Sequence, residues 1–345
     1  MTAPRLLTSA LCCALLLIVP APSAAQGDGR PIVGLERSTP LDEYAGWVLF
    51  SRWDGAAYRL STWRDGTVRD LPVPAQPDVF DADAGPDSAG KPSAALSLCH
   101  GSCDLYVIGF EAGDELRPVR NANTTNRDEV APTIWKGRLA FGRRYGRHEV
   151  VPYTKLLAAP RSRPSQRLAG LPQRRCGAID PPPCRRIEDV ALRSMELWGR
   201  WIAQSWTYQP DDFPGFRQNE IRLTNVAHTD TRQVAAMNTG LGGQTYLAPS
   251  IAEGRVAFFR ACQGDPAGCR ASNSGAIRYR ISNGDYTHVG ANEAWAGWAW
   301  SGAADYHVPS AFACGGGDPA VVAPACAIVR RTGLQWTPIS ASRVR

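Results

Sequence analysis

An eleven-residue stretch that occurs twice constrains the fold of this chain more than any other feature. Residues 131–141, Ala-Pro-Thr-Ile-Trp-Lys-Gly-Arg-Leu-Ala-Phe, return without a gap as residues 248–258, Ala-Pro-Ser-Ile-Ala-Glu-Gly-Arg-Val-Ala-Phe. In each copy a short apolar run leads to a turn that closes on glycine, and a second apolar run follows. This order is typical of a β-hairpin, in which glycine supplies the positive φ of a tight turn. The stretch therefore predicts a repeated pair of antiparallel strands.

Four looser copies follow the same plan. The glycines at which the six copies turn are 43 to 62 residues apart, and they are Gly46, Gly90, Gly137, Gly199, Gly254 and Gly297. Repeats of this length are typical of propellers and solenoids. A third and a fourth strand follow each hairpin, as at 57–62 and 68–71 in the first unit. The sequence thus predicts an all-β protein, a six-bladed β-propeller of four-stranded antiparallel blades, over residues 41–345.

The sequence also predicts how the two ends of the chain take part in the propeller. In the last unit, residues 326–329 and 334–337 are expected to form the third and fourth strands. Residues 26–40 are expected to be a flexible lead-in, in which 32–35 can add a strand that ties the N-terminus to the last repeat. Such a strand would remove the exposed edge between the first and last blades.

The first 25 residues have the order of a secretory signal peptide. Arg5 precedes an apolar run at 6–19, and small residues follow as Ala-Pro-Ser-Ala-Ala. We expect cleavage after Ala25. The apolar run is shorter than the roughly 20 residues of a membrane-spanning helix, and no later stretch is apolar enough. These features predict a soluble monomer that is secreted or periplasmic and has no transmembrane segment after signal cleavage.

The cysteines that remain after residue 25 agree with export. They form four close pairs: Cys99 with Cys103, Cys176 with Cys184, Cys262 with Cys269, and Cys314 with Cys326. Disulfides are the expected state of such pairs in an oxidising compartment. Zinc binding is the alternative, but the spacings are not of the Cys-x2-Cys kind and no histidine accompanies them. Three of the pairs bracket the link from the second to the third strand of a unit.

The repeat unit resembles a known family. A strand, a strand after a glycine turn, a third strand such as Asp104-Leu-Tyr-Val-Ile108 and a glycine-bearing turn look like the units of TolB-like six-bladed propellers, also described as WD40-like (PD40) repeats. The resemblance covers about residues 41 to 340, although the family's Ser-Pro-Asp-Gly turn is absent. It implies a periplasmic or secreted interaction module. Some relatives are instead the non-catalytic part of a peptidase, and we expect no hydrolase domain here, because the expected blades take up residues 41–345.

Acidic residues recur near the start of the first strand of most units. First strands line the channel of a propeller, so these carboxylates can ring one mouth and hold a cation or a basic peptide end. The alternative is that they accept backbone N–H groups of the loops between blades. The expected channel-mouth residues are Asp42, Asp81, Asp83, Asp128, Glu129, Glu188, Asp189 and Glu293. The segment 81–87 also resembles a calcium loop, but it lacks the third acid and the distal glutamate.

Basic charge gathers in one segment. The net charge is +6, and residues 138–186 hold twelve Lys and Arg against Glu149 and Asp180. Guanidinium groups suit phosphate and carboxylate, so this segment is a second candidate surface, for an anionic envelope polymer or an acidic protein. A solvated charged face is the alternative. Nucleic acid is not expected, because no aromatic stacking platform accompanies the arginines. The candidate residues are Arg143, Arg144, Arg147, Arg161 and Arg163.

Catalytic motifs are absent from the sequence. There is no Gly-x-Ser-x-Gly elbow, no His-Glu-x-x-His and no phosphate-binding glycine loop, and the five histidines are scattered singly. The tryptophans bunched at 295, 298 and 300 suggest a sugar-stacking surface or, as we expect, packing between blades. The sequence therefore favours a non-catalytic module, with no cofactor and no metal, that binds a protein, peptide or envelope polymer at a propeller face. The alternative is a hydrolase or lyase that acts on a carbohydrate or ester in the channel.

Overall fold

The fold is seen in a computed structural model. It describes residues 29–145, 149–168, 188–209, 217–227, 231–239, 244–246, 249–262, 274–290, 295–309 and 326–339. The elements of these residues are all β-strands. None of the described segments is a helix with the length and apolarity that a bilayer span requires.

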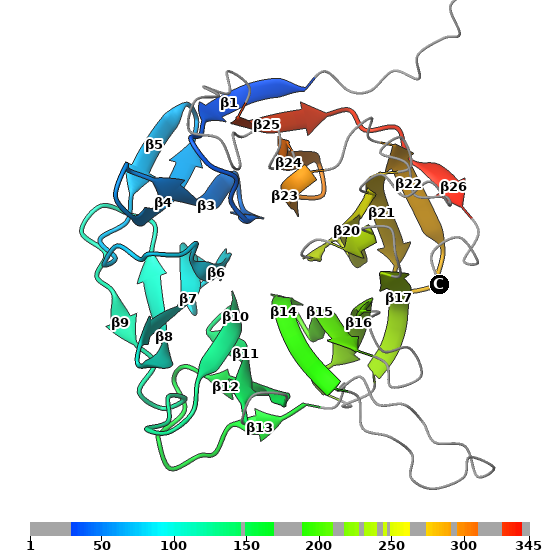
Figure 1. The fold of residues 1–345 in the computed structure, drawn as a ribbon. Helices are drawn as coiled ribbons and strands as arrows, with labels where there is room; N and C mark the ends of the chain where they lie inside the picture. Colours follow the sequence, from blue (N-terminus) through cyan, green and yellow to red (C-terminus); the bar gives the residue numbers. More distant parts are fainter. Residues whose placement is uncertain are drawn as a thin grey trace, which may run out of the picture.

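Six antiparallel sheets stand around one axis, so the expected six-bladed β-propeller is confirmed (Figure 1). Blade one contains β2 (Leu41–Tyr44), β3 (Trp47–Trp53), β4 (Tyr58–Arg64) and β5 (Thr67–Asp70). Blade two contains β6 (Asp81–Pro86), β7 (Pro92–His100), β8 (Ser102–Gly109) and β9 (Arg117–Pro118). Blade three contains β10 (Glu129–Trp135), β11 (Arg138–Arg144), β12 (Val150–Leu156) and β13 (Gln166–Arg167).

The other three blades depart further from the simple repeat. Blade four contains β14 (Glu188–Trp198), β15 (Trp201–Gln209), β16 (Arg217–Asn225) and β17 (Thr231–Thr239). Blade five begins with two short strands, β18 (Gln244–Tyr246) and β19 (Ser250–Ala252), which both pair with β20 (Arg255–Cys262), and it continues with β21 (Gly275–Arg280) and β22 (Tyr286–Gly290). Blade six contains β23 (Trp295–Trp300), β24 (Ala304–Pro309) and β25 (Ala327–Thr332).

Tight turns join the first two strands of most blades. At Ala45-Gly46, Lys136-Gly137 and Glu253-Gly254 both residues have positive φ, the geometry of a two-residue type I′ hairpin. Gly297 was expected to be the sixth such turn, and that expectation is wrong. Gly297 lies inside β23, next to a bulge, and the chain turns at Gly302, which has a φ of 92°.

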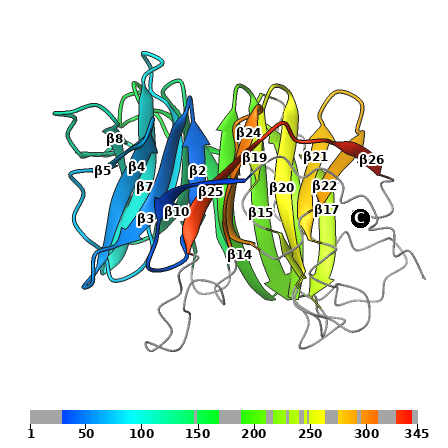
Figure 2. The ribbon, with the colours of Figure 1, turned by 90° about the horizontal axis from the view of Figure 1, so that it is seen from above.

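Strands from both chain ends close the ring. The N-terminal strand β1 (Arg30–Gly34) pairs with β25 as the outer strand of blade six, which confirms the expected closure (Figure 2). The sequence predicted that residues 334–337 would form this outer strand of blade six, and that prediction is wrong. The C-terminal strand β26 (Thr337–Ile339) instead pairs with β22 and adds a further outer strand to blade five (Figure 1).

The core consists of apolar layers between neighbouring blades. One cluster joins Leu49 of blade one to Leu96 of blade two, and another joins Leu223 of blade four to Phe258 of blade five. Trp298 and Trp300 are buried in the layer between blades five and six, so their expected packing role is confirmed.

Two glycines of the innermost strands allow close contact between blades. A Cβ at Gly85 would lie 2.0 Å from the carbonyl oxygen of Ile134, and one at Gly297 would lie 2.2 Å from that of Thr39. Any side chain at either position would therefore push two blades apart.

The expected disulfide of blade two is present. Cys99 and Cys103 face each other across the link from β7 to β8 and are bonded. Cys326 is also disulfide-bonded. Cys176, Cys184, Cys269 and Cys314 lie outside the described residues, and only the backbone of Cys262 is described, so the other three pairings stay predictions.

Candidate functional site

One position on the innermost strands carries a polar side chain in each of the first five blades. These residues, which we call the channel position, are Asp42, Asp83, Thr133, Glu196 and Ser250. Except for Asp83, each lies two residues before the end of its strand.

Side chains at the channel position bind backbone groups of the next blade. Asp42 accepts the N–H of Ala84, and Asp83 accepts that of Ile134 at 3.2 Å. The hydroxyl of Thr133 accepts the N–H of Leu197 at 2.8 Å, and that of Ser250 accepts the N–H of Trp300 at 3.2 Å. In four blades the same position thus fastens each blade to the following one, which explains why polar residues occur there.

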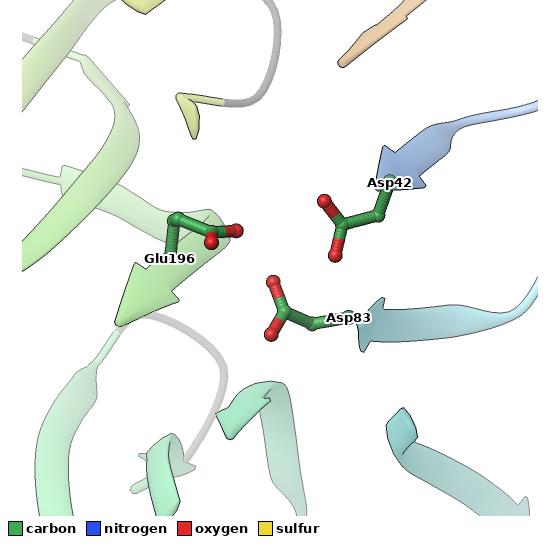
Figure 3. A group of neighbouring side chains, drawn as sticks. All are labelled: Asp42, Asp83 and Glu196. Carbon is green, nitrogen blue, oxygen red and sulfur yellow. The ribbon is translucent and has the colours of Figure 1, made fainter. Parts of the chain in front are cut away.

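The three acids of this set come together. Ligand oxygens of Asp42, Asp83 and Glu196 all lie within 4.8 Å of one another, and the side chains point toward a common centre from β2, β6 and β14 (Figure 3). Less than a tenth of the surface of each residue is exposed. Blades one and four stand on opposite sides of the axis, so Asp42 and Glu196 meet across it (Figure 1).

Burial and mutual repulsion change the protonation of this cluster. Burial, followed by the charge of Asp83, raises the pKa of Asp42 and that of Glu196 well above their ordinary values. Burial also raises the pKa of Asp83, to about 6, although hydrogen bonds from Glu196, Thr133 and Asp42 oppose this rise. Two carboxyl groups can hydrogen-bond to each other only if one keeps its proton. The cluster therefore holds protons at neutral pH, with Asp83 the group that ionises first.

A cavity opens at the cluster. Its volume is about 230 Å³, and residues of the innermost strands of blades one to five line it, including all three acids. Arg193 also lines it, and its guanidinium Nε donates to Thr207 at 3.4 Å. The cavity has room for a small ligand or for several water molecules beside the carboxylates.

This arrangement suits a positively charged ligand. Calcium lies about 2.3–2.6 Å from its oxygen ligands, so oxygens up to roughly 5 Å apart can share one ion. A protonated amine can equally donate to three carboxylates in charge-assisted hydrogen bonds. Of the described residues, these three are the ones whose ligand atoms gather closely enough to hold a metal ion.

Three of the other expected channel-mouth residues bind neighbouring groups of the protein. Asp81 also lines the cavity, and it accepts the N–H of Ala131 at 2.7 Å, where the backbone of β10 bulges. Asp128 accepts the N–H of Cys103 at 3.1 Å. Glu129 is fully buried and forms an ion pair with Arg143 at 2.9 Å. These residues hold loops and neighbouring strands, which is the alternative that the sequence left open.

The side chains of the remaining expected acids are not described by the structure. Glu188 and Asp189 begin β14, an innermost strand, but their side chains are not among those the structure describes. Glu293 lies outside the described residues.

The expected basic surface is partly internal. Arg143 has 12% of its side chain exposed, because it pairs with Glu129 and donates to the carbonyl of Ala122 at 2.7 Å. Arg144 is more exposed and pairs with Asp128 at 3.3 Å. Arg161 and Arg163 are exposed on the loop after β12, and Arg147 lies outside the described residues.

Glu196 is the one member of the acidic cluster that the sequence did not predict. The expectation followed acids near the start of each first strand, and β14 is eleven residues long, so its start lies far from the cluster. The turn glycine was the better reference point. Asp42, Thr133 and Ser250 all lie four residues before their turn glycine, and Glu196 lies three residues before Gly199.

No protein-family model matches the chain, and no curated protein matches it. Solved structures of similar fold include TolB from Acinetobacter baumannii, with 12% identity over 86% of this chain and 67% of that one and a TM-score of 0.46. They also include a puromycin hydrolase, with 14% identity over 93% of this chain and 58% of that one and a TM-score of 0.47. Prolyl oligopeptidase B from Galerina marginata is a third, with 14% identity, 71% and 32% coverage and a TM-score of 0.40.

Proposed function

We propose that this protein is an exported, non-catalytic binding module that recognises a positively charged ligand group in its central channel. The observation that carries the proposal is the convergence of Asp42, Asp83 and Glu196 from three separate blades onto one cavity of about 230 Å³. A closed propeller presents its loops around one axis, which places such a site where a partner can reach it.

The energetics of the cluster support this proposal. Burial and the charge of Asp83 raise the pKa of Asp42 and that of Glu196, so desolvation and repulsion destabilise the unliganded cluster. A divalent cation or a protonated amine reduces both the repulsion and the cost of desolvation, because its positive charge offsets the negative charge of the carboxylates.

Calorimetric titration of the mature chain tests the proposal. Calcium chloride, magnesium chloride and a lysine-containing tripeptide are titrated in turn at constant ionic strength. We expect saturable binding of at least one probe, and we expect Asp83→Asn and Glu196→Gln to weaken it about tenfold or more. These variants keep side-chain shape, and the Asn carbonyl still accepts the N–H of Ile134.

Asp65→Asn is the matched control, because Asp65 is an exposed aspartate at the Asp65-Gly66 turn of blade one. It removes the same charge and should leave binding unchanged. The proposal fails if no probe binds, or if Asp65→Asn weakens binding as much as the channel variants do.

An enzyme is the second candidate, and the same cavity favours it. Carboxyl groups with raised pKa values beside an arginine are components of general acid catalysis. Turnover in a panel of glycans and esters, lost in Glu196→Gln and kept in Asp65→Asn, would replace the binding module with a hydrolase or lyase.

A further inference from the structure

A second cavity, on the outer part of blade five, has the opposite charge. Its volume is about 340 Å³, near the lower end of the roughly 300–1,000 Å³ of small-molecule pockets. Arg255, Arg278 and Arg280 line it, together with Thr287 and the C-terminal strand residues Pro338 and Ile339.

The register of the sheet places the three arginines on one face. Arg255 of β20 is the direct partner of Arg280 of β21. Arg278 lies two residues before Arg280 on the same strand, and side chains two apart point to the same face of a sheet. Like charges directly opposite each other in a sheet are destabilising. The pairing of Arg255 with Arg280 therefore costs stability that a bound anion would offset.

Neighbouring groups orient Arg278 toward such a ligand. Its Nε donates to the hydroxyl of Thr287 at 3.2 Å, and its guanidinium lies 4.3 Å from the ring centroid of Trp336. Burial, followed by the charges of Arg255 and Arg280, lowers the pKa of Arg278. A guanidinium held by stacking and by one hydrogen bond keeps its other N–H groups in a fixed fork, which suits the oxygens of phosphate.

The acids nearby offset only part of this charge, since two carboxylates stand against three arginines. Glu253 pairs with Arg255 at 3.3 Å and is 68% exposed, so water screens the pair. Asp285 lines the cavity, and its carboxylate accepts the side-chain N–H of Asn283 at 2.5 Å in the turn between β21 and β22.

We propose that this cavity binds the phosphate group of a small phosphomonoester, with the three arginines on the phosphate oxygens and the apolar wall of β26 against the organic part. The site is separate from the channel and does not depend on its function. Strand β26 gives it its outer wall, so this role also accounts for a C-terminal strand that crosses to blade five rather than completing blade six.

Calorimetric titration with inorganic phosphate and with phenyl phosphate tests this proposal at constant ionic strength. We expect saturable binding of phenyl phosphate that Arg278→Gln and Arg280→Gln each weaken about tenfold or more, since each removes charge-assisted hydrogen bonds. Arg117→Gln, an exposed arginine on β9 of blade two, is the matched control and should change the affinity less than about twofold.

Thermal unfolding without phosphate separates binding from folding. Arg280→Gln should melt at the same temperature as the wild type or higher, because it removes one of two opposed charges. Tighter binding of phenyl phosphate than of inorganic phosphate supports a phosphomonoester, whereas equal affinity replaces it with free phosphate as the ligand. Absence of saturable binding by the wild type, or equal affinity in the arginine variants and the wild type, overturns the site.

Discussion

Asp42 and Glu196 stand on opposite blades of the propeller, and yet their carboxylate oxygens lie within 4.8 Å of each other. The contact spans the axis that the six blades share. The innermost strands therefore approach closely enough for two acidic side chains to span the channel. Burial raises the pKa of Glu196, and as a result of this approach the charge of Asp42 on the opposite blade raises it further.

The first prediction concerns the pH dependence of stability. The folded-state pKa of Asp83 is raised to about 6 and that of Glu43 to about 7, chiefly by burial, so both groups favour the folded state below their unfolded pKa values. This stability is lost as the pH rises from about 4 through 7. Without added cations the free energy of unfolding, measured by chemical denaturation at each pH, should fall over this range, and Asp83→Asn should reduce that fall by an amount on the order of 2 kcal/mol. An unchanged slope in Asp83→Asn, with Asp65→Asn as reference, would count against it.

The second prediction compares two neighbouring ion pairs of blade three. Glu129→Gln leaves Arg143 buried without its partner charge and should lower the free energy of unfolding by about 3 kcal/mol. Asp128→Asn breaks the more exposed pair with Arg144 and should cost less than about 1 kcal/mol. Chemical denaturation measures both, and equal costs would show that the burial of Glu129 does not matter.

The third prediction tests the contacts between innermost strands. Gly85→Ala and Gly297→Ala each place a Cβ against a backbone carbonyl of the next blade and should destabilise the protein by about 2 kcal/mol or more. Gly34→Ala meets no atom within 4 Å and should be neutral to within about 0.5 kcal/mol. Thermal unfolding of the three variants decides the matter, because a neutral Gly297→Ala would rule out the close approach to Thr39.

The fourth prediction concerns the two terminal strands. Deletion of residues 26–35 removes β1 and leaves β25 as an open edge, so the last blade should lose its cooperative unfolding. Deletion of residues 337–345 removes β26, the additional strand of blade five, and should lower the melting temperature less. Hydrogen exchange followed along the chain would distinguish them, and equal loss of protection in blade six would contradict the expectation.

The fifth prediction is that all four disulfides are local. Peptide mapping without reduction should find Cys176 with Cys184, Cys262 with Cys269 and Cys314 with Cys326, beside the bond from Cys99 to Cys103. A link between blades, such as one from Cys184 to Cys262, is the outcome that would be incompatible.

The repeat made the architecture predictable, because a period of strands and turn glycines depends on local geometry that the sequence shows directly. It failed at Gly297, since a glycine needed for close packing inside a strand looks the same in sequence as one needed for a turn. The prediction that residues 334–337 form the outer strand of the last blade also failed. A strand from either end of the chain can form the same hydrogen bonds with β25, and the sequence does not show which one does.

The site was less predictable than the fold. Asp42 and Asp83 were among the residues expected at the channel mouth, whereas Glu196 meets them only because opposite blades approach across the axis. The basic cavity of blade five was missed for a similar reason. The sequence shows Arg278 and Arg280 as part of an Arg-Tyr-Arg segment. However, it does not show the strand register that places Arg255 opposite Arg280, or the crossing of the C-terminal strand β26 that forms the wall of the cavity.

The pairing of β1 with β25 has a consequence for how the chain matures. Arg30 pairs with Arg330, three hundred residues later, so the first strand to emerge finds its partner only after nearly the whole chain has been made. Contacts this distant in sequence carry a large loop-closure entropy and form late. Until then β1 and the outer edge of β25 are both open to other chains. A quality-control factor that binds unpaired strand edges should therefore act on this protein during the interval between the completion of β25 and its capture of β1.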